Sequence, residues 1–219
     1  MKNQKKWNAF LLCSPILVLL IAREGIEILL PLVDFRIAWL PCILVYYGAI
    51  GLSFFFAKQW FEYDLSAMSL SWRPLPHLGL LLFTIILPGL SPLGVTLDYG
   101  SSIPSIYFLY IFVFAFINAP IEELYWRGLL STLPGGPLFR NFYTAALFSF
   151  SHYFLWGYWF NSLYLIIPVL IVTFLMGLLY MHFVNRTHNL LYPILSHILV
   201  DILNLSVAVY CGLVVPVHY

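Results

Sequence analysis

Long apolar runs, separated by short polar segments, fill almost the whole chain. They give seven candidate membrane spans, at about residues 8–32, 37–57, 77–97, 104–133, 141–156, 162–184 and 189–214. A transmembrane helix needs roughly 20 apolar residues, and only the fifth run is clearly short of this. Nothing between the runs is long enough to be a soluble domain. The pattern therefore predicts an all-α, polytopic bundle of about seven or eight transmembrane helices, with residues 1–219 forming a single membrane domain.

The composition agrees with lipid as the solvent. Of the 219 residues, 62% are hydrophobic and 9% are charged, whereas a typical soluble domain has about 25% charged residues. The net charge of +1 gives no electrostatic reason to expect a nucleic-acid partner. The three cysteines lie in apolar runs without metal-ligand spacing, and we interpret them as small core residues.

Lysine and arginine are distributed unevenly between the two sides that seven spans would define. With the N-terminus in the cytoplasm, eight of the ten Lys and Arg residues fall on the cytoplasmic side, and only Arg23 and Arg36 fall on the other. Cytoplasmic loops carry the excess of positive charge in membrane proteins. We therefore expect a multi-pass protein of the cell membrane with a cytoplasmic N-terminus and, with seven spans, an external C-terminus.

Three short motifs place ionisable side chains inside predicted spans, where such groups are costly and usually mark a functional site. They are EELYWR at 122–127, FSFSH at 148–152 and HILVD at 197–201. Each lies on a different predicted helix. The second half of the chain therefore contains nearly all the candidate chemistry.

The three motifs lie at similar depths in the predicted membrane. Glu122, His152 and His197 are each eleven or twelve residues from the cytoplasmic end of their span, which corresponds to about 16–18 Å along a helix. This spacing predicts that three helices bring one carboxylate and two imidazoles together near mid-membrane.

Helical spacing also predicts local partners. Glu123 and Arg127 are four residues apart and can form an ion pair, whereas Glu122 points about 100° away and need not share that partner. Phe148 lies one turn before His152 and can separate the imidazole from lipid. We therefore expect Glu123, Arg127 and Phe148 to support the site.

This set of side chains favours hydrolysis, most simply of an amide bond. A carboxylate beside an imidazole in a desolvated pocket can activate water as a general base, which suits Glu122 and His152. His197, with Asp201 one turn further on, can then stabilise an oxyanion. Alternatively, all four side chains are candidate ligands for zinc, which accepts nitrogen and oxygen donors and polarises water. The absence of a His-Glu-x-x-His motif weakens the zinc alternative, and the residues alone leave both routes open.

The ordered set of Glu-Glu-x-x-x-Arg, Phe-x-x-x-His and His-x-x-x-Asn/Asp on separate hydrophobic helices resembles the CPBP intramembrane proteases. That family includes the CAAX prenyl endopeptidases and the bacteriocin-processing or immunity (Abi) proteins. The resemblance covers about residues 105–205, and a weaker Phe-x-x-Gly motif corresponds to 174–177. It implies an intramembrane endopeptidase that cuts a membrane-associated peptide or protein. The family usually has eight helices, so an eighth would lie within 1–36 or 134–162.

The resemblance also implies roles by position. Glu122 would activate water together with His152, and His197 and Asp201 would form an oxyanion-binding pair or complete a metal site. The supporting residues would be Glu123 and Arg127. The family's last motif often ends in Asn, whereas Asp201 stands here. Because an ionised Asp is a poor oxyanion donor, Asp201 would instead orient His197, be protonated or bind metal.

The same residues are also compatible with roles other than catalysis. Glu122, Glu123 and Arg127 could be the solvated end of a helix, His152 could simply donate to a backbone carbonyl, and His197 with Asp201 could be a polar clasp between helices. A small membrane transporter and a non-catalytic immunity or scaffold protein on the same fold are the alternative functions. A lipid-pyrophosphate phosphatase fits worse, because phosphate calls for several converging cations.

Overall fold

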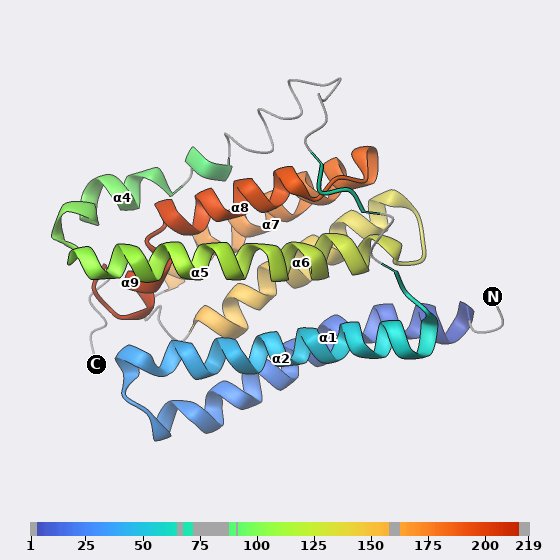
Figure 1. Cartoon of the computed structure of the whole chain (residues 1–219), viewed down its shortest axis with the longest axis horizontal. Helices are drawn as coiled ribbons and strands as arrows, with labels where there is room; N and C mark the ends of the chain where they lie inside the picture. Colours follow the sequence, from blue (N-terminus) through green and yellow to red (C-terminus); the bar gives the residue numbers. More distant parts are fainter. Residues whose placement is uncertain (1–3, 65–67, 72–87, 91, 158–162, 215–219) are drawn as a thin grey trace.

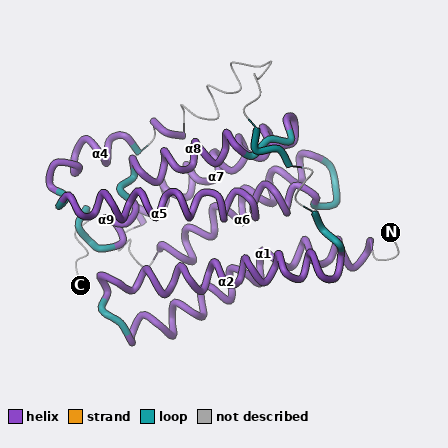
Figure 2. Tube along the Cα trace, in the orientation of Figure 1, coloured by secondary structure: helices purple, strands orange, loops and turns teal. Residues whose placement is uncertain are grey.

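The computed structural model describes residues 4–64, 68–71, 88–90, 92–157 and 163–214. These residues are helical apart from their turns and one isolated β-bridge between Ser69 and Asn189 (Figure 2). Their α-helices are α1 (Gln4–Leu29), α2 (Phe35–Phe61), α4 (Leu93–Tyr99), α5 (Ser105–Glu123), α6 (Pro137–Trp156), α7 (Leu163–Thr187), α8 (Leu191–Leu203) and α9 (Ser206–Tyr210). The predicted all-α class is confirmed.

The longer helices lie roughly along one common axis and alternate in direction (Figure 1). α1 and α2 form an antiparallel hairpin that packs through α1 against α6, while α5 packs against α8 and α6 packs against α7. The α1–α2 turn is fixed by Asp34, whose side chain accepts a hydrogen bond from the backbone N–H of Arg36 at 2.8 Å and caps α2. Helices distant in sequence, α2, α5 and α8, are thereby brought around one interior.

Four helical segments are long and apolar enough to cross a membrane: Gln4–Leu32, Arg36–Phe61, Ser105–Thr132 and Ile166–Thr187. They match four of the predicted spans and indicate an integral membrane protein. α6 has 20 residues but carries polar residues such as Asn141, Ser149 and His152, which lower its hydropathy. Among the described residues, the structure therefore shows four clear candidate spans, and a total of seven or eight stays a prediction.

The last predicted span, 189–214, is not one helix. α8 ends at Leu203, Leu205 takes a left-handed backbone conformation with φ of 53°, and α9 begins at Ser206. A residue in the left-handed conformation interrupts an α-helix. The break at Leu205 therefore divides the predicted span into two helices, and the hydropathy of the segment does not reveal it. Within 1–36 and 134–162, the described residues show only α1 with its 3-10 extension, the start of α2 and a single α6. Much of the predicted span 77–97 lies outside the described residues.

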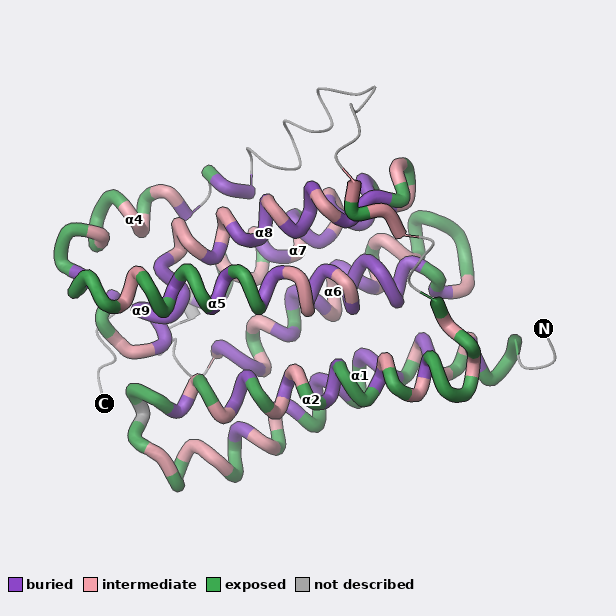
Figure 3. Tube along the Cα trace, in the orientation of Figure 1, coloured by how far each residue is buried: buried purple, intermediate pink, exposed green. Residues whose placement is uncertain are grey.

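Many residues on the outer faces of the bundle are exposed (Figure 3), and a number of them are large and apolar. Leu17 and Leu20 of α1, Leu44 and Phe55 of α2, and Phe116 of α5 are between 50% and 61% exposed. Water-soluble monomers rarely expose contiguous apolar surface of this kind. These faces are therefore suited to contact lipid.

Basic residues gather at one end of the bundle. Lys5 and Lys6 lie in the first turn of α1, Lys58 in the last turn of α2, Arg140 in the first turn of α6 and Arg186 in the last turn of α7. Because these helices alternate in direction, all four helix ends meet at the same end of the bundle (Figure 1).

Candidate active site

The backbone geometry changes where α5 carries its first motif. α5 contains Pro120 and is followed by a π-helical turn at Leu124–Gly128 and a 3-10 turn at Leu129–Thr132. Proline removes a helical N–H donor and crowds the preceding turn, and π-turns inside helices occur frequently at functional sites. Every residue from Tyr125 to Ser131 is buried. The distortion therefore keeps this motif facing the bundle interior instead of winding back to lipid.

Glu123 is the centre of a buried charge cluster. Its Oε1 accepts hydrogen bonds from Arg127 Nη1 and from His197 Nδ1, each at 2.8 Å. The Arg127 guanidinium also lies 4.0 Å from the centre of the Phe148 ring and 5.2 Å from that of Tyr180, within the range of a cation–π contact. The predicted Glu123–Arg127 pair is confirmed, and it extends across to α8.

Glu122 points in a different direction, as its helical position predicted. Its Oε1 accepts a hydrogen bond from the Tyr46 hydroxyl of α2 at 2.7 Å. Its Oε2 accepts from Asn118 Nδ2 at 3.4 Å and lies 3.5 Å from His197 Nε2. The two adjacent glutamates therefore contact opposite nitrogens of one imidazole.

Asp201 completes the polar cluster from α8. Its Oδ2 accepts from Asn118 Nδ2 at 3.0 Å, its Oδ1 accepts from Ser206 Oγ at 3.4 Å, and Oδ1 lies 3.9 Å from His197 Nε2. Asn118 thus donates to carboxylates on two helices, while its Oδ1 accepts from the Tyr47 hydroxyl at 3.0 Å. Asp201 here accepts hydrogen bonds, which is the behaviour expected of a carboxylate.

The ring of Phe148 lies between His152 and the rest of the cluster. Phe148 packs edge-on to both imidazoles, with its ring centre 4.8 Å from that of His152 and 6.0 Å from that of His197. His152 Nδ1 donates to the Phe148 carbonyl at 2.9 Å, as expected for a structural histidine. That bond places the proton on Nδ1 and leaves the lone pair of Nε2 for accepting a proton.

Burial rules out a solvated helix end for the first motif. Glu122, Glu123 and Arg127 are 1%, 0% and 1% exposed. Glu123 Oε2 and Arg127 Nη2 are also buried without a protein hydrogen-bond partner among the described residues. Ionisable groups held inside a membrane bundle are costly and usually mark a functional site.

Four residues that hold the carboxylates, either directly or through Asn118, were not predicted from the sequence: Tyr46, Tyr47, Asn118 and Ser206. Asn118 could have been identified as a site residue, because it is a polar residue inside an apolar run, one turn before Glu122. The two tyrosines had none, since tyrosine is frequent along the whole chain and α2 lies far away in sequence.

The four candidate zinc ligands do not form a metal site. Among the described residues, no group of three or more His, Cys, Asp or Glu side chains is arranged to hold a metal ion. Both nitrogens of His197 face carboxylate oxygens, and Nδ1 of His152 is bonded to a carbonyl. The donor atoms are thus directed mainly at protein partners, and zinc gains no support.

An apolar groove of about 780 Å³ runs between α2 and α5 beside this cluster. Trp39, Ile43 and Tyr47 line it from α2, and Tyr110 and Phe114 line it from α5. Tyr47 thus has its ring in the groove and its hydroxyl on Asn118. The groove is therefore connected to the carboxylates through two residues, Tyr47 and Asn118.

Comparison with protein families gives a match over residues 104–203, to the family described as type II CAAX prenyl endopeptidase Rce1-like. Comparisons with curated proteins and with solved structures gave no match. The matched segment holds α5, α6, α7 and α8, and with them all the motifs identified from the sequence. Residues 104–203 are therefore a domain of the Rce1-like type II CAAX prenyl endopeptidase family.

Proposed function

We propose that this chain is an intramembrane endopeptidase that hydrolyses a peptide bond of a membrane-associated peptide or protein. The observation that carries the proposal is the buried cluster of Glu122, Glu123, His197 and Asp201 inside the matched segment. The family implies protease activity, and the cluster supplies the groups that peptide hydrolysis requires.

In the proposed reaction, Glu122 is the general base. Its Oε1 is bound by Tyr46, so Oε2, which lies near His197 Nε2, is the oxygen that takes a proton from water. The water oxygen bonds to the peptide carbonyl carbon, and the C–N bond then breaks as the proton passes to the leaving amine. His152 assists this proton transfer through the lone pair of Nε2. Nε2 is the acceptor nitrogen of the ring because Nδ1 donates its proton to the Phe148 carbonyl.

His197 is the proposed oxyanion donor. Glu123 accepts from Nδ1 at 2.8 Å, and Glu122 and Asp201 both lie within 4 Å of Nε2. Carboxylates on both sides favour a proton on each ring nitrogen, so Nε2–H can donate to a developing oxyanion. Asp201 would thus orient His197 and would not itself donate.

Two further features support a substrate that arrives from the membrane. The groove beside Tyr47 is almost entirely apolar, which suits a hydrophobic substrate segment. The end of the bundle that carries Lys5, Lys58 and Arg186 agrees with a cytoplasmic N-terminus. The groove extends from Tyr47 toward Arg36, at the opposite end of the bundle from these basic residues.

Cleavage assays with purified protein in detergent test the proposal. The substrates are lipid-modified and unmodified peptides, and the variants are Glu122→Ala and, as a matched control, Glu24→Ala on exposed α1 surface. We expect wild type and Glu24→Ala to cleave at least one peptide class and Glu122→Ala to lose about 10²–10⁴-fold in rate. Equal cleavage by a folded Glu122→Ala protein would overturn the proposal.

A further inference from the structure

The carboxylate that we assign as general base is held by a residue outside the matched segment. Tyr46 lies on α2, 76 positions before Glu122, yet its hydroxyl is 2.7 Å from Glu122 Oε1. Tyr46 is completely buried and Glu122 is 1% exposed. Segment 104–203 therefore does not contain everything that positions its own carboxylate.

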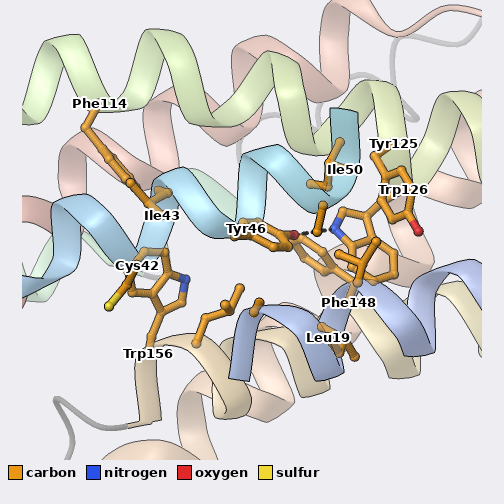
Figure 4. Close-up of a cluster of buried hydrophobic side chains, with 14 of the residues drawn as sticks. Leu19, Cys42, Ile43, Tyr46, Ile50, Phe114, Tyr125, Trp126, Phe148 and Trp156 are labelled. Carbon is orange, nitrogen blue, oxygen red and sulfur yellow. Dashed lines mark hydrogen bonds between the residues drawn. The ribbon is translucent and has the colours of Figure 1, made fainter. Parts of the chain in front are cut away.

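A third residue holds the Tyr46 hydroxyl in place. Trp126 Nε1 lies 3.0 Å from the Tyr46 hydroxyl (Figure 4). An indole N–H is only a donor, so the Tyr46 oxygen accepts from Trp126. The ionised carboxylate of a general base is only an acceptor, so the Tyr46 proton is donated to Glu122. Trp126 is itself completely buried within the π-helical turn. The order of donors is therefore Trp126 to Tyr46 to Glu122.

This order distinguishes the two oxygens of Glu122. Oε1 receives the short bond from Tyr46, whereas Oε2 has only the longer contacts with Asn118, at 3.4 Å, and His197, at 3.5 Å. A carboxylate oxygen with a strong donor is a weaker proton acceptor than its partner oxygen. The bond also fixes the plane of the carboxylate.

We propose that Tyr46, supported by Trp126, is a positioning residue that holds Glu122 Oε1 and presents Oε2 to the attacking water, a role that rests on the function proposed above. It predicts that α2 is required for the rate of the chemical step as well as for folding. It also gives the π-helical turn a role, since that turn carries the indole that orients the hydroxyl.

The test is steady-state kinetics of peptide cleavage by Tyr46→Phe, which removes the hydroxyl and keeps the ring. We expect kcat to fall about 10- to 100-fold, as for loss of a hydrogen bond to a charged group, with KM within about twofold of wild type. Tyr47→Phe is the control on the neighbouring position, because its hydroxyl contacts Asn118 and not Glu122, and it should lose less in kcat.

A kinetic double-mutant cycle separates positioning from general packing. Trp126→Phe removes the indole donor, so it should lower kcat in wild type but have little further effect in the Tyr46→Phe background, because both act through one hydroxyl. Tyr46→Phe should likewise add nothing to Glu122→Gln. Additive losses in the two cycles, or an unchanged kcat for Tyr46→Phe, would overturn the proposal.

Glu122→Gln measured alongside keeps the two proposals distinguishable. If Glu122→Gln is inactive and Tyr46→Phe is fully active, only the positioning role fails. If folded Glu122→Gln retains wild-type kcat, the proposed function fails. Should Trp126→Phe not fold, the comparison of Tyr46→Phe with Tyr47→Phe still decides the matter.

Discussion

The buried ion pair between Arg127 and Glu123 should be essential for stability, and Arg127→Met tests this. The two side chains are 1% and 0% exposed, and their closest charged atoms are 2.8 Å apart. Methionine preserves much of the length of the side chain but removes its charge. Glu123 would then remain buried with His197 as its only hydrogen-bond donor in the described contacts.

The expected loss is large. Removing one partner of a buried ion pair typically costs about 3–5 kcal/mol, because the other charge is left uncompensated. Loss of the guanidinium from the Phe148 ring, 4.0 Å away, adds up to roughly 2 kcal/mol. Because His197 still donates to Glu123, we expect a total of about 3 kcal/mol, near the lower end of the range.

The chain offers a matched control in the exposed pair of Arg23 and Glu27. These residues are also four positions apart on a helix, but their side chains are 32% and 46% exposed, so Arg23→Met should cost less than about 1 kcal/mol. The assay is reversible unfolding in mixed detergent, followed by circular dichroism. The double variant Glu123→Gln/Arg127→Met should recover at least about 1 kcal/mol relative to Arg127→Met.

Two results would refute this reasoning. The first is a loss of unfolding free energy for Arg127→Met that lies within about 1 kcal/mol of the loss for Arg23→Met. The buried ion pair would then contribute no more to stability than the exposed one. The second is a double variant as unstable as the sum of the single variants, since the two charges would then not be coupled.

The packing and the donor pattern lead to three more predictions. Gly177→Ala should destabilise the protein by about 1–3 kcal/mol, because a Cβ there would lie 2.9 Å from a backbone carbon of α6. The control Gly51→Ala should be neutral or stabilising in the same unfolding assay, because a Cβ there would have no atom within 4 Å. Asn118→Leu should lower kcat at least about tenfold by removing the donor to two carboxylates, whereas Asn185→Leu, which contacts Asn141 instead, should leave kcat unchanged. Exhaustive removal of metal with a chelator should leave cleavage unchanged, because both nitrogens of His197 already face carboxylates. Metal content is measured on the same sample, and activity that is lost on chelation and restored by zinc would contradict this prediction.

The candidate site was predictable to the extent that it depends on helical spacing. Glu123 with Arg127, and His197 with Asp201, are each four residues apart, and the structure places both pairs on shared faces. Their similar depths in the predicted spans also indicated that the Glu122 and His197 helices would meet, and these side chains are 3.5 Å apart.

The remaining features depend on contacts that no local pattern encodes. Tyr46 reaches Glu122 only because the α1–α2 hairpin packs beside α5. The break at Leu205 likewise leaves the hydropathy of 189–214 unchanged, so the last run resembled one span although it holds α8 and α9. Hydropathy reports whether a segment is apolar, and it does not report where the backbone turns.

The glycine of the weaker Phe-x-x-Gly motif shows a third case. Apart from the resemblance to the family, no pattern in the chain required a glycine at position 177. In the structure, Gly177 lies where α7 approaches Ala145 of α6 too closely for a Cβ. The close contact keeps α6, and with it His152, against the bundle, so packing accounts for the glycine.

The most direct test of the central claim compares two adjacent glutamates in single-turnover cleavage of a bound peptide. Proton transfer is assigned to Glu122, and the anchoring of Arg127 and His197 is assigned to Glu123. Glu122→Gln should therefore slow the chemical step by about 10²–10⁴-fold while its unfolding free energy and peptide binding stay near those of wild type. Glu123→Gln should lose stability as well as rate. A single-turnover rate for folded Glu122→Gln within about threefold of wild type would contradict the assignment of Glu122 as the base.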